Sequence, residues 1–370
     1  MTIAYSGDNI TFPDASVQNT APKAGMVNRI INGDMRIDQR NAGASVTPAD
    51  GQYLVDRWAG MQAVASKYSA QRNAGSVAPP AGFSNYLGAT SLSAYSVGAT
   101  DYFGFRQSIE GFNTADLAWG TANAQSITLS FWVRSSLTGT FGGALQNAAS
   151  NRFYAFSYTI SAVNTWEKKT VVVAGDTSGT WATENTAGLR LTFGLGVGST
   201  YSVAAGSWGS SAAISATGAT SVVGTSGATF YITGVQLEKG STATDFDYRP
   251  YELALCQRYY QKSYPQATVP GTSIVHTSGG CQNFWWAASA SSTIGGGGTA
   301  LPVAMRTQPT VVIYDMAGTS GVVSGHSSGG TLTNGVALNQ TYATENNVFA
   351  RVYNVSYVGI SYAYTLTAEL

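Results

Sequence analysis

The sequence predicts a nearly all-β protein. Short runs rich in aromatic and β-branched residues alternate with clusters of Gly, Ser, Thr and Asn along most of the 370 residues. Before residue 250, no segment between these runs carries a helical apolar stripe, which argues against crossover helices and a parallel sheet. One such stripe appears between residues 250 and 263. We therefore expect a jelly-roll β-sandwich, then a linking helix, then a smaller C-terminal β-sandwich domain.

The low charge of the chain limits its classes of partner. Charged residues are 10% of the chain and the formal net charge is +0, against about 25% charged residues in an ordinary soluble protein. Nucleic-acid binding needs clustered Lys and Arg, and no stretch approaches the roughly 20 apolar residues of a membrane span. We therefore expect no nucleic-acid partner and no membrane insertion. The composition suits a neutral partner such as a sugar, or burial in a large assembly.

Residues 1–26 form a separate segment. Its scattered apolar side chains are too few for a core, so it becomes ordered by packing on its own domain, a sister copy or a larger assembly. These side chains are Ile3, Tyr5, Ile10, Phe12 and Val17. The opening MTIAYSGDNITF lacks the basic and apolar regions of a signal peptide, so we expect synthesis in a cytoplasm.

Residues 27–249 are expected to form the jelly-roll domain. Its strand-like runs are bounded by turn-forming clusters. The runs are 53–61, 102–110, 127–134, 153–160, 166–173, 189–197 and 229–238.

Alternation of side chains assigns faces to these strands. In 127–134, Phe131 and its apolar neighbours at every second position face the core, while Trp132 and Arg134 face away. The same pattern places Arg106 and Arg190 away from the core on two other strands. If these three strands are neighbours in one sheet, its outer face carries all four side chains. In the last run, the alternation puts Tyr231, Thr233, Val235 and Leu237 on one face.

The segment 250–263 is predicted to be the linking helix. Pro250 suits its first turn, and Glu252 complements the positive end of the helix dipole. Its apolar face must be covered by the C-terminal domain or by sister subunits. That face carries Leu253, Cys256 and Tyr260.

Residues 264–370 are expected to form the smaller β domain. Its expected strands are 273–276, 283–289, 310–314, 348–355 and 360–368. The glycine-rich runs at 295–298 and 324–330 are interpreted as flexible loops. The two cysteines of the chain, Cys256 and Cys281, are expected to be buried thiols.

An ordered set of motifs resembles a known family. The motifs are VNRIINGDMRIDQR at 27–40, YLVDRW at 53–58, RQSIEG at 106–111, ITLSFWVRSSLTGTF at 127–141, NTWEKKTVVVAGDTSGTW at 164–181 and FYITGVQLEKGSTATDFDYRPYELALCQRYY at 230–260. Together they resemble the jelly-roll domain, similar to carbohydrate-binding modules, of bacteriophage and prophage tail-fibre and appendage proteins. The match covers roughly residues 27–263. ITFPDASVQNTA near the start resembles the short leader of such proteins, and LPVAMRTQPTVVIYD and YAYTLTAEL are similar to their C-terminal part.

The resemblance implies a virion tail-fibre or spike subunit without catalysis. Such a subunit would be a homotrimer, bind other tail proteins through residues 1–26 and contact a host-surface glycan. Jelly rolls of this kind often hold a structural calcium, whose ligands the sequence does not assign. A structural or decorating virion protein with no receptor role is the alternative. A polysaccharide depolymerase is disfavoured because the sequence shows no internal repeat.

Aromatic side chains supply the candidate glycan-binding residues, because sugar rings stack on them beside amides, Arg and carboxylates. The candidates are Trp119, Trp132, Arg134, Trp181, Arg190, Trp208, Trp285 and Trp286. Strand tryptophans favour packing in the core, and the loop tryptophans favour subunit contacts at least as strongly as binding.

The sequence shows no catalytic constellation. GHSSG at 325–329 has the spacing of a nucleophile elbow, but the GTLTNGV directly after it cannot form the helix that the elbow needs. His276 and His326 are the only histidines, so a metal site is disfavoured. Asp245 and Asp247 are expected to cap or support the turn before the helix. The other carboxylates considered for glycosidic cleavage, Asp34, Asp38 and Glu184, are scattered among loops.

Overall fold

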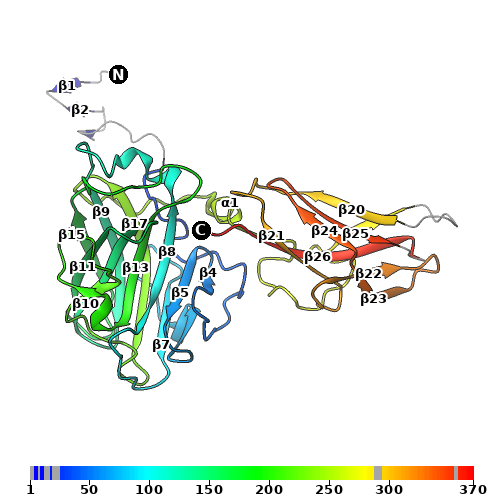
Figure 1. Cartoon of the computed structure of the whole chain (residues 1–370), viewed down its shortest axis with the longest axis horizontal. Coiled ribbons are helices and arrows are strands. Elements are labelled where there is room, and N and C mark those ends of the chain that lie inside the picture. Colours follow the sequence, from blue (N-terminus) through cyan, green and yellow to red (C-terminus); the bar gives the residue numbers. More distant parts are fainter. Residues whose placement is uncertain (1–3, 7–8, 12–16, 19–25, 287–293, 354–356) are drawn as a thin grey trace.

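Two antiparallel sheets packed face to face form the N-terminal body, and a narrower β body extends from its side (Figure 1). The structure, a computed structural model, describes residues 4–6, 9–11, 17–18, 26–286, 294–353 and 357–370. Over these residues the chain is nearly all β-structure. The predicted fold class, a jelly-roll sandwich followed by a smaller β domain, is confirmed.

The N-terminal body has seven strands in one sheet and five in the other. Their orders are β15-β11-β10-β13-β8-β5-β4 and β12-β9-β17-β7-β6. The strands are β4 (Tyr53–Val55), β5 (Trp58–Gln62), β6 (Tyr68–Arg72), β7 (Leu87–Ser91), β8 (Tyr102–Glu110), β9 (Ile127–Ser135), β10 (Gly139–Asn147), β11 (Phe153–Ile160), β12 (Glu167–Val173), β13 (Ala187–Val197), β15 (Trp208–Gly209) and β17 (Thr229–Lys239).

Small elements complete this body. Near the N-terminus, β1 (Ala4–Ser6), β2 (Asn9–Thr11) and β3 (Val17–Gln18) pair with one another. A parallel pair is formed by β14 (Ser202–Val203) and β16 (Ser215–Ala216). The 3₁₀ turns are Ala74–Ser76, Gly111–Asn113, Ala115–Leu117 and Ser199–Tyr201.

Aromatic side chains from both sheets form the core between them. Phe131 of β9 lies edge-on to Phe193 of β13, with ring centroids 5.0 Å apart. Phe105 of β8 lies 6.2 Å from Phe230 of β17. Each pair joins one sheet to the other, so burial of these rings holds the sandwich closed. The predicted core face of β9 is confirmed, because Ile127, Leu129, Phe131 and Val133 are all fully buried.

The three strands that would place four outward side chains on one face are not neighbours in one sheet, so that face does not form. Arg106 on β8 and Arg190 on β13 lie in the seven-stranded sheet, whereas Trp132 and Arg134 on β9 lie in the five-stranded sheet. Alternation fixes which side chains point outward but not which sheet a strand joins, because strand pairing is long-range. The two pairs therefore occupy opposite outer faces of the sandwich.

The single strand expected at 53–61 is instead the hairpin of β4 and β5. Its turn contains Arg57, whose φ of 70° is left-handed. The carboxylate of Asp56 accepts hydrogen bonds from the backbone and side chain of Gln39, and Arg57 pairs with Glu369. The contacts of Asp56 and Arg57 are made with residues outside 53–61. The sequence of this run alone therefore does not show the turn.

A bulge in β17 corrects a second expectation. Tyr231 and Thr233 pair with Arg134 and Trp132 on the outer face, but the register shifts before Gln236, and Leu237 then pairs with the core residue Leu129. Gly234 supplies the left-handed residue, with φ of 60°. One extra residue reverses the alternation. Val235 and Leu237 are therefore fully buried in the core rather than sharing the face of Tyr231.

The C-terminal body has two sheets on one core. Its strands are β18 (Tyr260–Lys262), β19 (Gln282–Trp285), β20 (Ile294–Ala300), β21 (Thr310–Tyr314), β22 (Val322–His326), β23 (Leu332–Ala337), β24 (Gln340–Ala343), β25 (Asn347–Tyr353) and β26 (Gly359–Thr367). The strand β26 pairs with β18, β19, β21 and β22, and β20-β25-β24 forms the second sheet. Side chains of β25 and β26 meet in the core.

The glycine-rich run 295–298 is a strand and not a loop, whereas the run 324–330 is a strand in its first three residues and a turn after them. Residues 295–298 lie within β20, where a Cβ on Gly297 would stand 1.8 Å from the Phe284 ring. Glycine is needed there because an aromatic ring covers the strand, and this contact has no local sequence signal. In the run 324–330, the first three residues belong to β22 and His326 is buried. No strand forms at 273–276, and residues 287–289 of another expected strand lie outside the described residues.

The linking helix is shorter than the predicted 250–263. The helix α1 spans Glu252–Gln257, and Tyr260–Lys262 forms β18 paired with β26. The buried carboxylate of Glu252 pairs with Arg249 rather than mainly complementing the helix dipole. Cys256 is buried as expected, and Cys281 is partly buried; both are free thiols. Tertiary pairing with β26 overrides the helical pattern of the last residues.

Buried charges join the two bodies. Glu369, just after β26, accepts hydrogen bonds from Arg57 and, at 2.9 Å, from Arg40. At the end of β8, Glu110 receives two hydrogen bonds from Arg258, at 2.9 and 2.6 Å, and one from the Tyr259 hydroxyl at 2.5 Å. Burial alone would raise the pKa of Glu110, but these hydrogen bonds outweigh it and lower that pKa.

Glu369→Gln tests this joint. The substitution keeps the shape of the side chain but leaves Arg57 buried without a compensating charge, so we expect the unfolding free energy to fall by about 3–5 kcal/mol. Urea unfolding of the full chain measures it. The control Glu345→Gln removes an exposed carboxylate of the same body and should cost less than about 0.5 kcal/mol. Equal effects of the two substitutions would contradict a charge-dependent joint.

Candidate functional site

An aromatic groove of about 340 Å³ lies on the outer face of the five-stranded sheet. We call it the Trp132 groove. Its floor comes from β9, β12 and β17, and its walls come from the segments 81–83 and 244–248. The lining residues are Ala81, Gly82, Phe83, Ser130, Trp132, Lys168, Gly234, Thr244, Asp245, Phe246 and Tyr248.

Four aromatic rings line this groove. Trp132 points outward from β9 between its sheet partners Thr233 of β17 and Lys168 of β12. Phe83, Phe246 and Tyr248 form a cluster with ring centroids 4.9–5.7 Å apart. Tyr248 remains 49% exposed, so the cluster offers aromatic surface to a ligand. Such flat apolar surfaces match the apolar faces of sugar rings.

Polar contacts fix the walls of the Trp132 groove. The buried carboxylate of Glu238 accepts hydrogen bonds from the backbone and side chain of Thr244, both at 2.8 Å, and the Gln236 amide donates to the Asp245 carbonyl at 3.1 Å. The Tyr248 hydroxyl donates to the Gly82 carbonyl. Burial and the nearby Asp34 raise the pKa of Tyr248, which keeps the phenol a neutral donor.

Two exposed charges of opposite sign complete the groove. Lys168 and Asp245 both lie in its lining and are exposed to solvent. An ammonium group donates and a carboxylate accepts hydrogen bonds, so together they can bind hydroxyl groups at the edge of a ring held on the aromatic surface.

Gly234 makes the groove possible. A Cβ on this residue would lie 2.6 Å from the Phe83 ring and 3.2 Å from the Trp132 ring. The same glycine adopts the left-handed conformation of the β17 bulge. One backbone feature therefore both reverses the faces of β17 and leaves room for the two rings.

Arg134, predicted beside Trp132, lies on the same face but outside the groove lining. Its Nε donates to the Asn164 carbonyl at 2.9 Å, and its guanidinium lies 5.4 Å from the Tyr231 ring centroid. Tyr231 belongs to a neighbouring cluster with Tyr86 and Trp166. Arg134 thus supports an aromatic patch beyond the groove.

Trp119, Trp181 and Trp208 pack on one another. Their ring centroids are 4.7, 5.2 and 5.3 Å apart and every pair is edge-to-face. The three indole N–H groups donate to the carbonyls of Gln125, Ser178 and Ala174 at 2.7, 3.1 and 2.7 Å. Trp119 is buried and the other two lie against the main core. These tryptophans pack on one another within the chain, and Trp181 and Trp208 remain partly exposed, so their roles as glycan candidates or subunit contacts stay predictions.

The C-terminal pair of tryptophans divides between exposure and packing. Trp285 is 60% exposed, with its ring centroid 4.4 Å from that of His326. Trp286 is half-buried, donates to the Tyr357 carbonyl at 3.0 Å and covers Gly295 of β20. Trp285 therefore remains available to a ligand, whereas Trp286 packs. Arg190 of β13 lies in the seven-stranded sheet, whereas Trp132 and Arg134 of β9 lie in the five-stranded sheet.

One Ser–His contact has the distance of a nucleophile–base pair. The Ser361 hydroxyl lies 2.5 Å from His326 Nε2, and it also donates to Asn283. Ser361 is fully buried in the middle of β26, so a substrate cannot reach it. At 325–329 the chain turns from β22 into β23 rather than into a helix. The nucleophile-elbow spacing therefore lacks its structural context.

Two of the carboxylates considered for glycosidic cleavage, Asp34 and Asp38, make local structural contacts. Asp34 pairs with Arg36 at 3.4 Å, and Asp38 accepts from the backbone of Asn41 and Gly43. Neither Asp245 nor Asp247 caps α1, because its N-cap residue is Tyr251, which makes no side-chain cap. The Asp247 carboxylate accepts from the Asn28 backbone N–H at 3.4 Å, and the Asp247 backbone N–H donates to the Gln236 side chain at 2.8 Å.

Among the described residues, no three or more His, Cys, Asp and Glu side chains gather closely enough to hold a metal ion. Calcium also uses backbone carbonyls, so the structural calcium stays a prediction. No helix in the described parts of the chain is long and apolar enough to cross a membrane.

Comparison with known proteins finds similarity in structure. No protein-family model and no curated protein matches the chain. One similar structure is the enzymatically active domain of tailspike protein 4 from bacteriophage CBA120, with 13% identity and a TM-score of 0.33 over 58% of this chain and 22% of that chain. A CBM4 structure has 13% identity and a TM-score of 0.31, over 56% of this chain and 98% of that chain.

A family 11 carbohydrate-binding module from Clostridium thermocellum, in complex with a β-1,3-1,4-mixed-linked tetrasaccharide, is also similar. Its identity is 12% and its TM-score 0.27, over 54% of this chain and 98% of that chain. The match to the tailspike spans about a fifth of that protein's chain.

Sequence reasoning identified Trp132 but missed the residues that complete its groove. Phe83, Phe246 and Tyr248 lie in loops, where alternation assigns no face. The one local signal was the closely spaced aromatic pair in DFDY at 245–248, directly after the last strand of the sandwich.

Gly234→Ala tests the floor of the groove. We expect a loss of about 1–2 kcal/mol from the left-handed conformation and a further loss from the clash with Phe83, together with weaker ligand binding. The control Gly218→Ala has a φ of 77° but open space around its Cβ, so it carries the first loss alone. Thermal unfolding of both variants separates the two terms, and equal losses would contradict the close packing at Gly234.

Trp119→Ala tests the tryptophan cluster. Removing this buried ring should lower the unfolding free energy by about 3–5 kcal/mol and leave ligand affinity unchanged in the folded protein. Urea unfolding gives the first quantity, and calorimetric titration with the ligand of the Trp132 groove gives the second. A stable variant that has lost ligand binding would assign Trp119 to a binding site instead.

Proposed function

We propose that this chain is a non-catalytic glycan-binding protein whose Trp132 groove holds a sugar ring. The observation that carries the proposal is the half-exposed aromatic lining of that groove beside Lys168 and Asp245. A ring placed on Trp132 or Tyr248 would bury an apolar face, and its hydroxyls would meet a donor on one side and an acceptor on the other. Neither the stacking of the ring nor these hydrogen bonds require a charged ligand.

The proposed occupant is a neutral oligosaccharide. The volume of about 340 Å³ lies near the lower end of ordinary ligand pockets, which suits one or two sugar rings rather than a long buried chain. The groove lies on a sheet face, so further rings of the same oligosaccharide can continue along that face.

We further propose that the protein is a subunit of a virion tail fibre or spike, acting as a homotrimer that contacts a host-surface glycan. Three features support this. The motifs between 27 and 263 resemble appendage proteins, the surface is poor in charge, and the described strands of the N-terminal segment, β1–β3, pair only with one another. That segment would join the subunit to other tail proteins.

A structural or decorating role without a receptor is the second candidate. The exposed aromatic side chains of Tyr251 and Trp285 favour it, because such residues also form subunit contacts. The two candidates differ in one outcome: a decorating protein binds no glycan in the Trp132 groove.

Trp132→Ala tests the proposed function. Calorimetric titration of the full chain with cellotetraose, xylotetraose and β-1,4-galactotriose is expected to find a ligand. Loss of a central aromatic contact typically costs about 2 kcal/mol or more, so affinity for that ligand should fall roughly thirtyfold. The fold should persist because Trp132 is partly exposed.

The matched control is Phe112→Ala, which removes a 58% exposed ring of the same body outside the groove. It should bind as the wild type does. Binding that is unaffected by Trp132→Ala would place the glycan elsewhere, and the absence of binding to any glycan of a wider array would favour the decorating role.

A further inference from the structure

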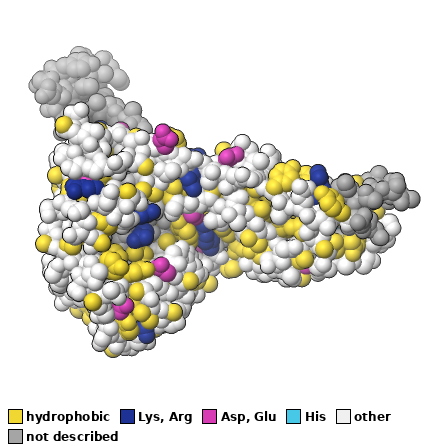
Figure 2. Space-filling model, viewed as in Figure 1, with side chains coloured by type: hydrophobic (Ala, Val, Ile, Leu, Met, Phe, Trp, Pro, Cys, Tyr) yellow, Lys and Arg dark blue, Asp and Glu magenta, His cyan; other side chains and the backbone are white. Residues whose placement is uncertain are grey.

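Two arginines occupy the outer face of the seven-stranded sheet, opposite the Trp132 groove. Arg106 of β8 pairs with Thr192 of β13, and Arg190 of β13 pairs with Ser108 of β8. The arginines are thus diagonal neighbours, about 7–8 Å apart along the sheet. Figure 2 shows basic side chains near the middle of the jelly roll, where Figure 1 draws β13 and β8.

Arg106 forms no direct ion pair with the described residues. Of the arginines in the described parts of the chain, it alone makes no hydrogen bond or ion pair with described residues, and its buried Nε has no acceptor. Burial lowers the pKa of Arg106, and the charge of Arg190 lowers it further. Asp50 offsets part of this effect, but it is exposed and receives its hydrogen bonds from Tyr102 and Gln62.

Arg190 is only weakly bound. Its Nη1 lies 3.4 Å from the Ala148 carbonyl and 3.5 Å from the Ser150 hydroxyl, at the limit for hydrogen bonds. Arg152 provides the contrast within the same body, because its guanidinium makes two 2.7 Å hydrogen bonds to Asp176. Arg152 thus has a carboxylate in direct contact, whereas neither arginine of the pair on this face forms an ion pair with a described carboxylate.

An anion bound between the two arginines would offset the repulsion between their charges. Two like charges at diagonal positions, one of them largely desolvated, destabilise the sheet when nothing lies between them. The planar guanidinium donates two parallel hydrogen bonds to a carboxylate or phosphate, and two such groups can share one anion. Gln146 of β10, opposite Arg190, and the Ser150 hydroxyl add neutral groups that can meet sugar hydroxyls.

We propose that Arg106 and Arg190 bind the anionic group of an acidic saccharide, either the carboxylate of a uronic acid or a phosphate ester. This site goes beyond the Trp132 groove, because it lies on the other sheet and requires a charge that the groove does not. Ligand binding at the two sites can therefore be tested separately.

The test uses calorimetric titration of the full chain with four probes: tri-galacturonic acid, its neutral methyl ester, glucose 1-phosphate and sodium phosphate. We expect an acidic saccharide to bind and the methyl ester not to bind. Arg106→Gln and Arg190→Gln should each weaken that binding roughly tenfold or more. Arg351→Gln, which removes one charge from β25 in the other body, should leave it unchanged.

Stability separates binding from a structural role. Without ligand, Arg106→Gln should be at least as stable as the wild type, because it removes an unpaired, partly buried charge; a structural role predicts a loss. Trp132→Ala should still bind the acidic probe. Equal affinity for acid and ester, unchanged binding by both arginine variants, or phosphate alone binding as tightly as the saccharides would each overturn the proposal.

Discussion

The bulge at Gly234 and Val235 in β17 is the constraint on which the rest of the structure depends. The bulge reverses the alternation of side chains along β17. Tyr231 and Thr233 before it face outward, and Leu237 after it faces the core. The backbone that the bulge leaves free is taken up by the N-terminal end of the domain. Val235 N–H donates to the Gly33 carbonyl at 2.9 Å, and the Asn28 side chain donates to the Val235 carbonyl at 3.1 Å. A Cβ on Gly33 would lie 2.1 Å from that carbonyl, so this approach requires glycine.

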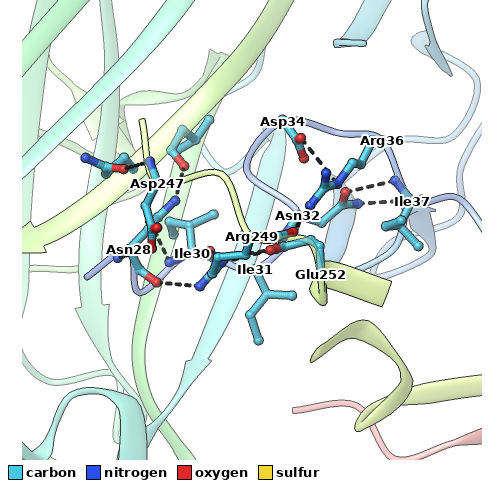
Figure 3. Close-up of polar contacts among 12 residues, drawn as sticks. Asn28, Ile30, Ile31, Asn32, Asp34, Arg36, Ile37, Asp247, Arg249 and Glu252 are labelled. Atoms are coloured by element: carbon cyan, nitrogen blue, oxygen red, sulfur yellow. Dashed lines mark hydrogen bonds and ion pairs between the residues drawn. The ribbon is translucent and has the colours of Figure 1, made fainter. Parts of the chain in front are cut away.

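The same contacts lead from the bulge to the joint between the two bodies. Arg249 donates to the carbonyls of Asn28 and Ile30 and pairs with Glu252, whose carboxylate accepts from the backbone of Asn32 (Figure 3). Desolvating such a pair is costly, and its attraction repays the cost only where hydrogen bonds satisfy the remaining groups. Here those groups are backbone atoms of a segment far away in sequence. The chain is poor in charge overall, and many of its charges lie inside, where they fix geometry instead of covering the surface.

Local sequence patterns predicted most of the strands. Long-range packing determined which sheet each strand joins and which loops surround Trp132. The strands β8 and β11 have their predicted bounds because turn-forming clusters flank a clear alternation. The strand β10 was missed because its glycines hide the alternation, although Gly143 is needed where a Cβ would stand 2.4 Å from the Phe156 ring. Trp132 could be placed on an outer face from sequence, but its sheet could not. The aromatic residues around it come from loops held in place by Glu238 and Gln236, contacts that no local pattern encodes.

The joint places the C-terminal body at the rim of the sandwich and not on its sheet faces. Its contacts to the jelly roll use the turn between β4 and β5, at Arg57, and the end of β8, at Glu110, both at the rim of the seven-stranded sheet. The lining of the Trp132 groove accordingly contains no residue of the C-terminal body. Because packed sheets are separated by about 10 Å of core, the groove and the arginine pair face opposite directions. A single oligosaccharide cannot reach both without passing around an edge, so occupation of both proposed sites would hold two separate saccharide chains on one sandwich.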